Sequence, residues 1–241
     1  MNIAFLIPVK INKLNLNSKI YNLLNSFFIN KVEKYNYNFY LGFNYNDKCL
    51  ENKKIFNIFN SNNFSVNIKE FNSNIRTGHL TKMWNELFHV SYKDNDYFYQ
   101  LGDDILMDNY DFLDQYINVL ESMDNLGVTG YLTKNGNNEI LTQSFVSKKH
   151  YEIFGYYFPE SIINWCCDNW ISDVYKKFNL YKPLDKKITN SSDTERYKIT
   201  YNEENYRIDL KEGIRILRTY IANKKMSKIK SWFKKLFKIK D

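Results

Sequence analysis

Hydrophobic and polar residues follow two different periods along the chain. Short apolar runs at 3–8, 38–43, 64–68 and 96–101 are typical of strands, and the first, IAFLIP, is continuous, as in a strand buried on both faces. Elsewhere apolar residues recur every three or four positions, which is the helical spacing. The predicted helices cover residues 16–32, 79–90, 112–123 and 162–178.

Two more apolar runs follow, at 126–132 and 139–146, and we expect them to form antiparallel strands at an edge of the sheet. The alternation of strands and helices predicts an α/β fold, with a mostly parallel, Rossmann-like sheet and helices on both faces. Ligands of such sheets bind at the carboxyl ends of the strands.

The composition excludes several classes of protein. The chain has 241 residues, of which 44% are hydrophobic and 17% aromatic, so it can bury a sizeable core and is not a disordered chain. Three cysteines without a CxxC pair argue against a disulfide scaffold and a structural zinc site, and favour a reducing, cytoplasmic compartment. No apolar run reaches the roughly 18 residues that a membrane span needs.

The positive charge is confined to the end of the chain. The net charge is +7, from 34 basic and 27 acidic residues, and residues 221–241 alone hold eight lysines and one acidic residue. The remaining chain is therefore neutral on balance, which argues against a nucleic-acid groove through the fold.

Within this basic end, residues 226–240 read MSKIKSWFKKLFKIK. Apolar residues at three- and four-residue steps form one helical face, and lysines surround it. The apolar residues are Ile229, Trp232, Phe233, Leu236 and Phe237. We therefore expect a C-terminal helical extension at 201–241 with a basic amphipathic helix that lies on an anionic membrane surface. The alternatives are a helix docked on the core through the same face and, less favoured, a tail that binds nucleic acid.

An acidic pair, Asp103 and Asp104, ends the aromatic strand at 96–101. Adjacent carboxylates repel each other, so a cation should compensate them, and oxygen ligands suit Mg²⁺ or Mn²⁺ shared with a substrate diphosphate. The alternative interpretations are a solvated turn and a helix N-cap.

The segments GHLTKMWN at 78–85 and DYFYQLGDDI at 96–105 resemble glycosyltransferases of the GT-A fold. The chain is similar to the small family-2-like glycosyltransferases of large DNA viruses. In such enzymes a hydrophobic strand ends in a DxD-type motif that holds the metal and the ribose of a nucleotide-sugar. Gly102 replaces the first acid here, so the resemblance implies that Asp104 takes the metal position with Asp103 beside it.

The resemblance also implies which residues contact the donor, most of all a UDP-sugar. The loop after the first strand would lie against the base, the loop after the second would touch base or ribose, and two cations would neutralise the diphosphate. These residues are Pro8 and Val9, then Asn44 and Asp47, then Arg76 and Lys82.

On the acceptor side, the segments at 154–159 (FGYYFP) and 165–170 (WCCDNW) resemble the family's acceptor segment. The resemblance implies that Asp168 is the general base of an inverting transfer to a glycan, protein or lipid-linked acceptor. Residues 1–200 would form the catalytic domain, with a nucleotide-sugar half at 1–105 and an acceptor half at 106–200. The aromatic residues of these segments could stack on sugars, although core packing is the commoner role.

Two other functions remain open. A sugar nucleotidyltransferase shares this type of fold but would carry a Gly-rich, basic loop after the first strand, where this chain has KINKLN. A non-catalytic nucleotide-sugar-binding module is supported by the missing first acid.

Two smaller expectations complete the sequence analysis. His150 follows two lysines and is expected in solvent. The polar stretch Ser191, Ser192, Asp193, Arg196 and Tyr197 is expected to fold over the donor.

Overall fold

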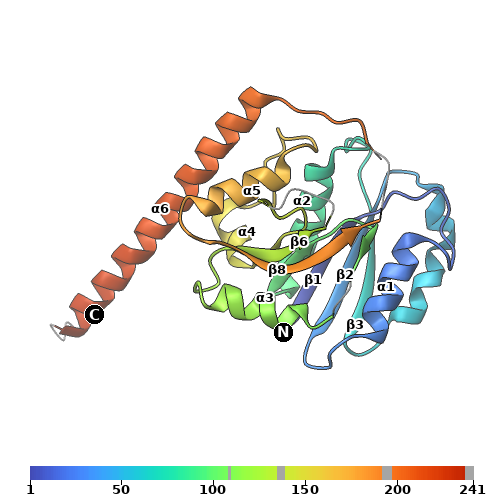
Figure 1. Cartoon of the computed structure of the whole chain (residues 1–241), viewed down its shortest axis with the longest axis horizontal. Helices are drawn as coiled ribbons and strands as arrows, with labels where there is room; N and C mark the ends of the chain where they lie inside the picture. The colour runs from blue at the N-terminus through green and yellow to red at the C-terminus, as the bar shows by residue number, and fades with distance from the viewer. Residues whose placement is uncertain (108–109, 135–138, 192–196, 237–241) are drawn as a thin grey trace.

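A computed structural model of the chain describes residues 1–107, 110–134, 139–191 and 197–236. Its strands form one sheet in the order β3-β2-β1-β4-β7-β6-β8-β5, which Figure 1 shows at the centre of the molecule. The strands are β1 Asn2–Pro8, β2 Asn36–Phe43, β3 Phe64–Glu70, β4 Tyr97–Gln100, β5 Ile105–Leu106, β6 Val128–Thr133, β7 Phe145–Ser147 and β8 Tyr181–Asn190.

Helices cover both faces of this sheet. They are α1 Lys19–Ile29, α2 Leu80–Ser91, α3 Phe112–Glu121, α4 Lys149–Phe154, α5 Cys167–Lys176 and α6 Glu203–Leu236, with 3-10 helices η1 Lys48–Phe59 and η2 Tyr92–Asp94. Alternate residues of β1 divide between two cores: Phe5 packs with α1 and α3, whereas Leu6 packs with α2 and α5. The predicted α/β class with helices on both faces is confirmed.

The sheet is parallel from β3 to β4 and mixed beyond it. β7 pairs antiparallel with both β4 and β6, so the predicted antiparallel pairing is confirmed. The predicted position at an edge of the sheet is wrong for both strands, because β7 lies between β4 and β6, and β6 lies between β7 and β8. The β7 residues Phe145 and Val146 are fully buried, and an inner position covers them on every side.

β8 was not evident from the sequence, although it pairs in parallel with β6. Its sequence, YKPLDKKITN, mixes lysines with apolar residues and has no clear period. Contacts with β6 and β5, not its own hydrophobic pattern, determine that this segment is a strand.

The helix predicted at 162–178 begins later, at Cys167, because Cys166 before it has a left-handed backbone with φ of 70°. Trp165 therefore lies outside the helix, 52% exposed, and does not share a helical face with Asp168. The neighbouring aromatics Tyr157, Phe158 and Trp170 are fully buried, so they pack the core and are not open to a sugar.

His150 is buried, so its expected exposure to solvent is wrong. α4 turns the ring inward, where Nδ1 lies 2.9 Å from the Tyr175 hydroxyl and Nε2 lies 3.0 Å from the Tyr157 carbonyl oxygen. Burial lowers the pKa of His150 to about 4, because a charged imidazole is poorly solvated there.

This burial predicts an acid-sensitive fold. The unfolded chain binds a proton at the His150 ring below about pH 6.5, whereas the folded chain does so only near pH 4, so stability falls as the pH falls between these values. The expected loss is about 3 kcal/mol in the free energy of unfolding. Urea unfolding at pH 7 and pH 4.5 measures this loss. Between these two pH values, the free energy of unfolding should fall less in His150→Gln than in the wild type. An equal loss in both proteins would contradict this role.

α6 confirms the predicted C-terminal helical extension. Within the predicted amphipathic stretch, residues 237–240 and the side chains of residues 228 and 230–236 lie outside the described part of the chain. Among the described residues, no helix combines the length and the apolar character needed to cross a membrane.

Candidate functional site

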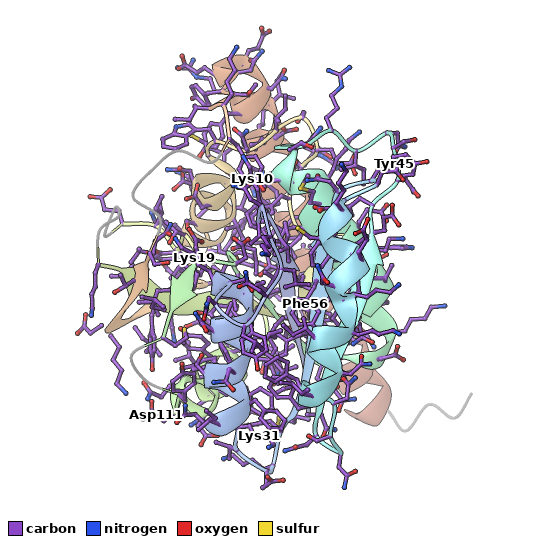
Figure 2. All side chains as sticks on the ribbon, turned by 90° about the vertical axis from the view of Figure 1, so that its right-hand side faces the viewer. Lys10, Lys19, Lys31, Tyr45, Phe56 and Asp111 are labelled. Atoms are coloured by element: carbon purple, nitrogen blue, oxygen red, sulfur yellow. The ribbon has the colours of Figure 1, made fainter. Side chains whose placement is uncertain are left out.

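The acidic pair lies at the carboxyl end of β4, beside the end of β1. Asp103 is 1% exposed and Asp104 is 4% exposed, so neither is a solvated turn residue, and the next element is the short strand β5, not a helix. Figure 2 shows that Lys10 and Tyr45, which follow β1 and β2, lie in the upper half of the view, with Lys31 and Asp111 near the bottom. The pair therefore lies at the end where ligands of α/β sheets bind.

The two carboxylates have different surroundings. Asp103 Oδ2 accepts a hydrogen bond of 2.8 Å from the backbone N–H of Lys10, which ties the end of β4 to the loop after β1. Asp104 instead lines a small cavity of about 140 Å³. The pair thus combines a carboxylate that fixes the loop and a carboxylate on the wall of the cavity, and metal binding by Asp103 stays a prediction.

Gly102 leaves room for the Asp104 side chain. A Cβ atom at position 102 would lie 2.7 Å from Asp104 Oδ1, so any larger residue would displace the carboxylate. The Gly102 N–H also donates to Gln143 Oε1 at 2.9 Å. The glycine in place of the first acid is therefore part of what positions Asp104.

A second, larger cavity of about 650 Å³ adjoins the first, and Tyr197 lines both. Its described lining includes five basic side chains and no acidic one. These are Lys10, Arg76, His79, Lys82 and Lys198. We call this space the cationic cavity. Its lining favours an anionic ligand.

Two features shape the cationic cavity. Lys10 Nζ lies 4.2 Å from the centroid of the Tyr197 ring, a cation–π contact that holds the lysine at the wall. Lys82 Nζ lies 3.6 Å from Glu160 Oε2, so part of its charge is already compensated. Arg76, in the loop before α2, is exposed at the cavity wall.

The remaining donor-side candidates differ in whether they line a cavity. Pro8 lines the Asp104 cavity. Val9 is 2% exposed within the core, and its N–H donates to the Gly42 carbonyl at 2.7 Å, so both its side chain and its N–H are engaged in the fold. Asp47 Oδ1 accepts from the Cys49 N–H at 2.9 Å and caps η1. Asn44 Oδ1 is buried with no hydrogen-bond partner in the described part of the chain.

Asp168 lies in the first turn of α5, where Oδ1 accepts from the Asn169 N–H at 2.9 Å. Burial raises the pKa of this carboxyl, which makes it a stronger base. Asp168 is not among the described residues that line the two cavities, whereas Asn164 shortly before it lines the cationic cavity and donates to the Gly78 carbonyl at 3.0 Å. Its role as a base stays a prediction.

Sequence reasoning missed several residues of the site. Trp84 lines the Asp104 cavity, and its buried indole N–H has no partner within the described residues, so it can donate to a ligand. Lys198 and Gln143 come from loops far along the chain, and nothing local marks them. Of the stretch expected to cover the donor, Ser191 and Tyr197 reach the site, while Ser192, Asp193 and Arg196 lie outside the described residues.

The donor set fits a divalent cation shared with a ligand. The described parts of the chain hold no group of three His, Cys, Asp or Glu side chains that could bind a metal ion. The described lining of the Asp104 cavity offers one carboxylate, and Gln143 and Thr142 also line it. Hard cations such as Mg²⁺ and Mn²⁺ accept such oxygen ligands and usually keep waters and phosphate oxygens as well.

Comparison of the sequence with protein-family models and with characterised proteins found no match. Solved structures do match. A cytidylyltransferase from Leptospira borgpetersenii has a TM-score of 0.50 at 9% identity, over 92% of this chain and 94% of that one. Glucosyl-3-phosphoglycerate synthase from Mycobacterium tuberculosis, in complex with Mg²⁺ and UDP, has a TM-score of 0.53 at 10% identity, over 81% and 72%. The fold is therefore GT-A-like.

Proposed function

We propose that this protein is a glycosyltransferase that moves a sugar from a nucleoside-diphosphate sugar, UDP-sugar in particular, to an acceptor hydroxyl. The observation that carries the proposal is the cationic cavity beside the buried Asp104 at the carboxyl ends of β1 and β4. A diphosphate suits the cationic cavity, and a sugar suits the smaller cavity lined by Asp104. The similar synthase was solved with UDP and Mg²⁺ or Mn²⁺, which agrees with this class of ligand.

In this proposal Lys10, Arg76 and Lys198 neutralise the diphosphate. The start of α2 adds a partial positive charge from its aligned peptide dipoles, and no acidic residue in the first turn offsets it. Gly78 and His79, just before α2, line the cavity, so this charge faces the ligand. Asp104 is the residue that would hold Mg²⁺ or Mn²⁺, and such an ion would stabilise the negative charge that develops on the leaving diphosphate. The Trp84 N–H would donate to a sugar hydroxyl in the smaller cavity.

The proposed reaction is a single displacement with inversion. The acceptor oxygen forms a bond to the anomeric carbon as the bond to the diphosphate oxygen breaks, and the electron pair leaves with the diphosphate. The hydroxyl proton passes to the Asp168 carboxylate, whose basicity is raised by burial.

A sugar nucleotidyltransferase is the second candidate. Its specific support is the similarity to the cytidylyltransferase, which extends over 92% of this chain. Lys10, in the loop after β1, lines the cationic cavity. This loop contains no glycine, whereas a loop whose backbone N–H groups surround a triphosphate is usually rich in glycine. The two reactions release different products, a nucleoside diphosphate or pyrophosphate, so product analysis separates them.

The first test is thermal unfolding with a panel of nucleoside diphosphates, with and without Mn²⁺. A ligand at about 100 times its Kd adds roughly 2.7 kcal/mol, which raises the Tm of a protein of this size by about 5–10 °C. Arg76→Ala should weaken UDP binding by about 10- to 100-fold, as for the loss of one charge-assisted hydrogen bond. The control is Arg218→Ala, an exposed arginine on α6.

Incubation with UDP-sugars and candidate acceptors should then release UDP. Release of pyrophosphate from a nucleoside triphosphate and a sugar would favour the nucleotidyltransferase. No shift with any nucleotide, or equal shifts in both arginine variants and the wild type, would argue against a nucleotide site in the cationic cavity.

A further inference from the structure

The long helix α6 changes character part of the way along its length. From Tyr206 to Ile221 it packs against the core around α4 and α5, and Leu217 is fully buried. The last described contact with the body is the ion pair of Lys224 with Asp124, at 3.4 Å. Beyond it Met226 and Ile229 are 55% and 54% exposed, and Figure 1 shows α6 continuing away from the sheet.

The charge changes at the same place as the packing. The segment of α6 before residue 222 carries four acidic and four basic residues, whereas residues 222–241 carry eight lysines and one aspartate. The proximal segment is thus neutral and held by the fold, while the distal segment is strongly basic. A helix whose only task was to cover the core would need no such difference.

The apolar row of the distal segment also points in a different direction. At about 100° per residue, Met226 lies about 180° and Ile229 about 120° around the helix from the buried Leu217. The sequence continues this row with Phe233 and Leu236, while Trp232 lies about 60° from Leu217, at the border between this row and the packed face. Lysines occupy the positions in line with Leu217, namely 224, 228 and 235. The distal apolar row is therefore not a continuation of the face that packs on the core.

We propose that the distal segment of α6, residues 225–236, binds the surface of an anionic lipid bilayer. Its apolar row would enter the boundary between headgroups and acyl chains, and its lysines would contact anionic headgroups. The docked-helix alternative requires the apolar row to face the body, which the exposed Met226 and Ile229 oppose. The proposal goes beyond the proposed function, and its test needs no nucleotide-sugar.

The test is co-sedimentation of the full chain with vesicles of phosphatidylcholine alone or mixed with phosphatidylglycerol. We expect binding to the anionic vesicles at low salt, little binding to the neutral vesicles, and release at high salt. Phe233→Glu should lower the bound fraction at least about 10-fold, because it places a charge in the apolar row. The double variant Lys228→Glu with Lys235→Glu should abolish the preference for anionic lipid.

The matched control is Ile208→Glu, at an apolar residue that is 59% exposed on the proximal segment of the same helix, and this variant should bind like the wild type. Circular dichroism and the Tm check that each variant is folded. Equal recovery in the supernatant with and without anionic vesicles, or wild-type binding by Phe233→Glu, would overturn the proposal. So would a dimer that Phe233→Glu dissociates without any vesicle binding, or binding to duplex DNA but not to vesicles.

Discussion

Replacement of Asp104 by alanine is expected to abolish the Mn²⁺-dependent binding of a nucleoside diphosphate while the fold persists. The carboxylate is 4% exposed and lines the smaller cavity, so its loss removes the anionic oxygen ligand from that wall. The Asp104 backbone carbonyl accepts hydrogen bonds from the Ser191 N–H at 2.9 Å and the Ser191 hydroxyl at 2.7 Å. Alanine keeps that carbonyl, so the contact between this loop and the segment after β8 should survive.

The measurement is the Tm with UDP in the presence and absence of Mn²⁺. The roughly 5–10 °C rise expected for the wild type should disappear in Asp104→Ala, and sugar transfer should fall by at least about 10²-fold. Asp111→Ala, which removes an exposed carboxylate paired with Lys186, is the control and should behave like the wild type. A folded Asp104→Ala protein with the full Mn²⁺-dependent shift would rule out this residue as the metal ligand.

Asp103→Ala separates the two members of the acidic pair. Because alanine removes the acceptor of the Lys10 N–H, the main expected effect is a lower Tm without ligand, with the Mn²⁺-dependent shift retained. Loss of that shift in Asp103→Ala but not in Asp104→Ala would show that Asp103, not Asp104, is the metal ligand.

Asp168→Asn is expected to lower sugar transfer by about 10²- to 10⁴-fold, as for the loss of a general base. Asparagine keeps the size of the side chain and can still accept the Asn169 N–H, so α5 should start as before. UDP binding should be unchanged, since the residue is proposed to act on the acceptor. The variant therefore separates a loss of chemistry from a loss of donor binding.

The matched control for this variant is Asp173→Asn, on the same helix. Asp173 accepts a 2.8 Å hydrogen bond from the Tyr206 hydroxyl, so its replacement affects the contact between α5 and α6 and not the proposed reaction. Initial rates at saturating donor, measured from pH 5 to 9, are the readout. Near-wild-type turnover in Asp168→Asn would exclude it as the base, whatever the effect on stability.

Local sequence pattern was sufficient for much of the fold. The continuous apolar run of β1, the aromatic run of β4 and the helical spacing of α1, α2 and α3 each depend on which side chains alternate or recur within a few residues. These patterns identified the elements near the site and the acidic pair at the end of β4. The change from a neutral chain to a basic C-terminal segment is likewise a property of the sequence alone.

Pairing and burial between distant segments were decided only by the tertiary structure. β7 is an inner strand because it pairs with β4 on one side and β6 on the other. His150 is buried because its ring nitrogens form hydrogen bonds with Tyr157 and Tyr175 inside the core. Neither contact has a signal within a few residues of the element concerned.

The same distinction applies to the candidate site. The sequence by itself determined that two carboxylates follow β4, that cations precede α2, and that the chain ends in a basic segment with an apolar period. It did not determine that Asp103 holds the Lys10 loop while Asp104 lines a cavity, or that Lys10, Arg76 and Lys198 surround one space. Periodicity reports which face of an element a residue occupies, whereas a site depends on how separate elements are packed together, and that packing is fixed by contacts across the whole fold.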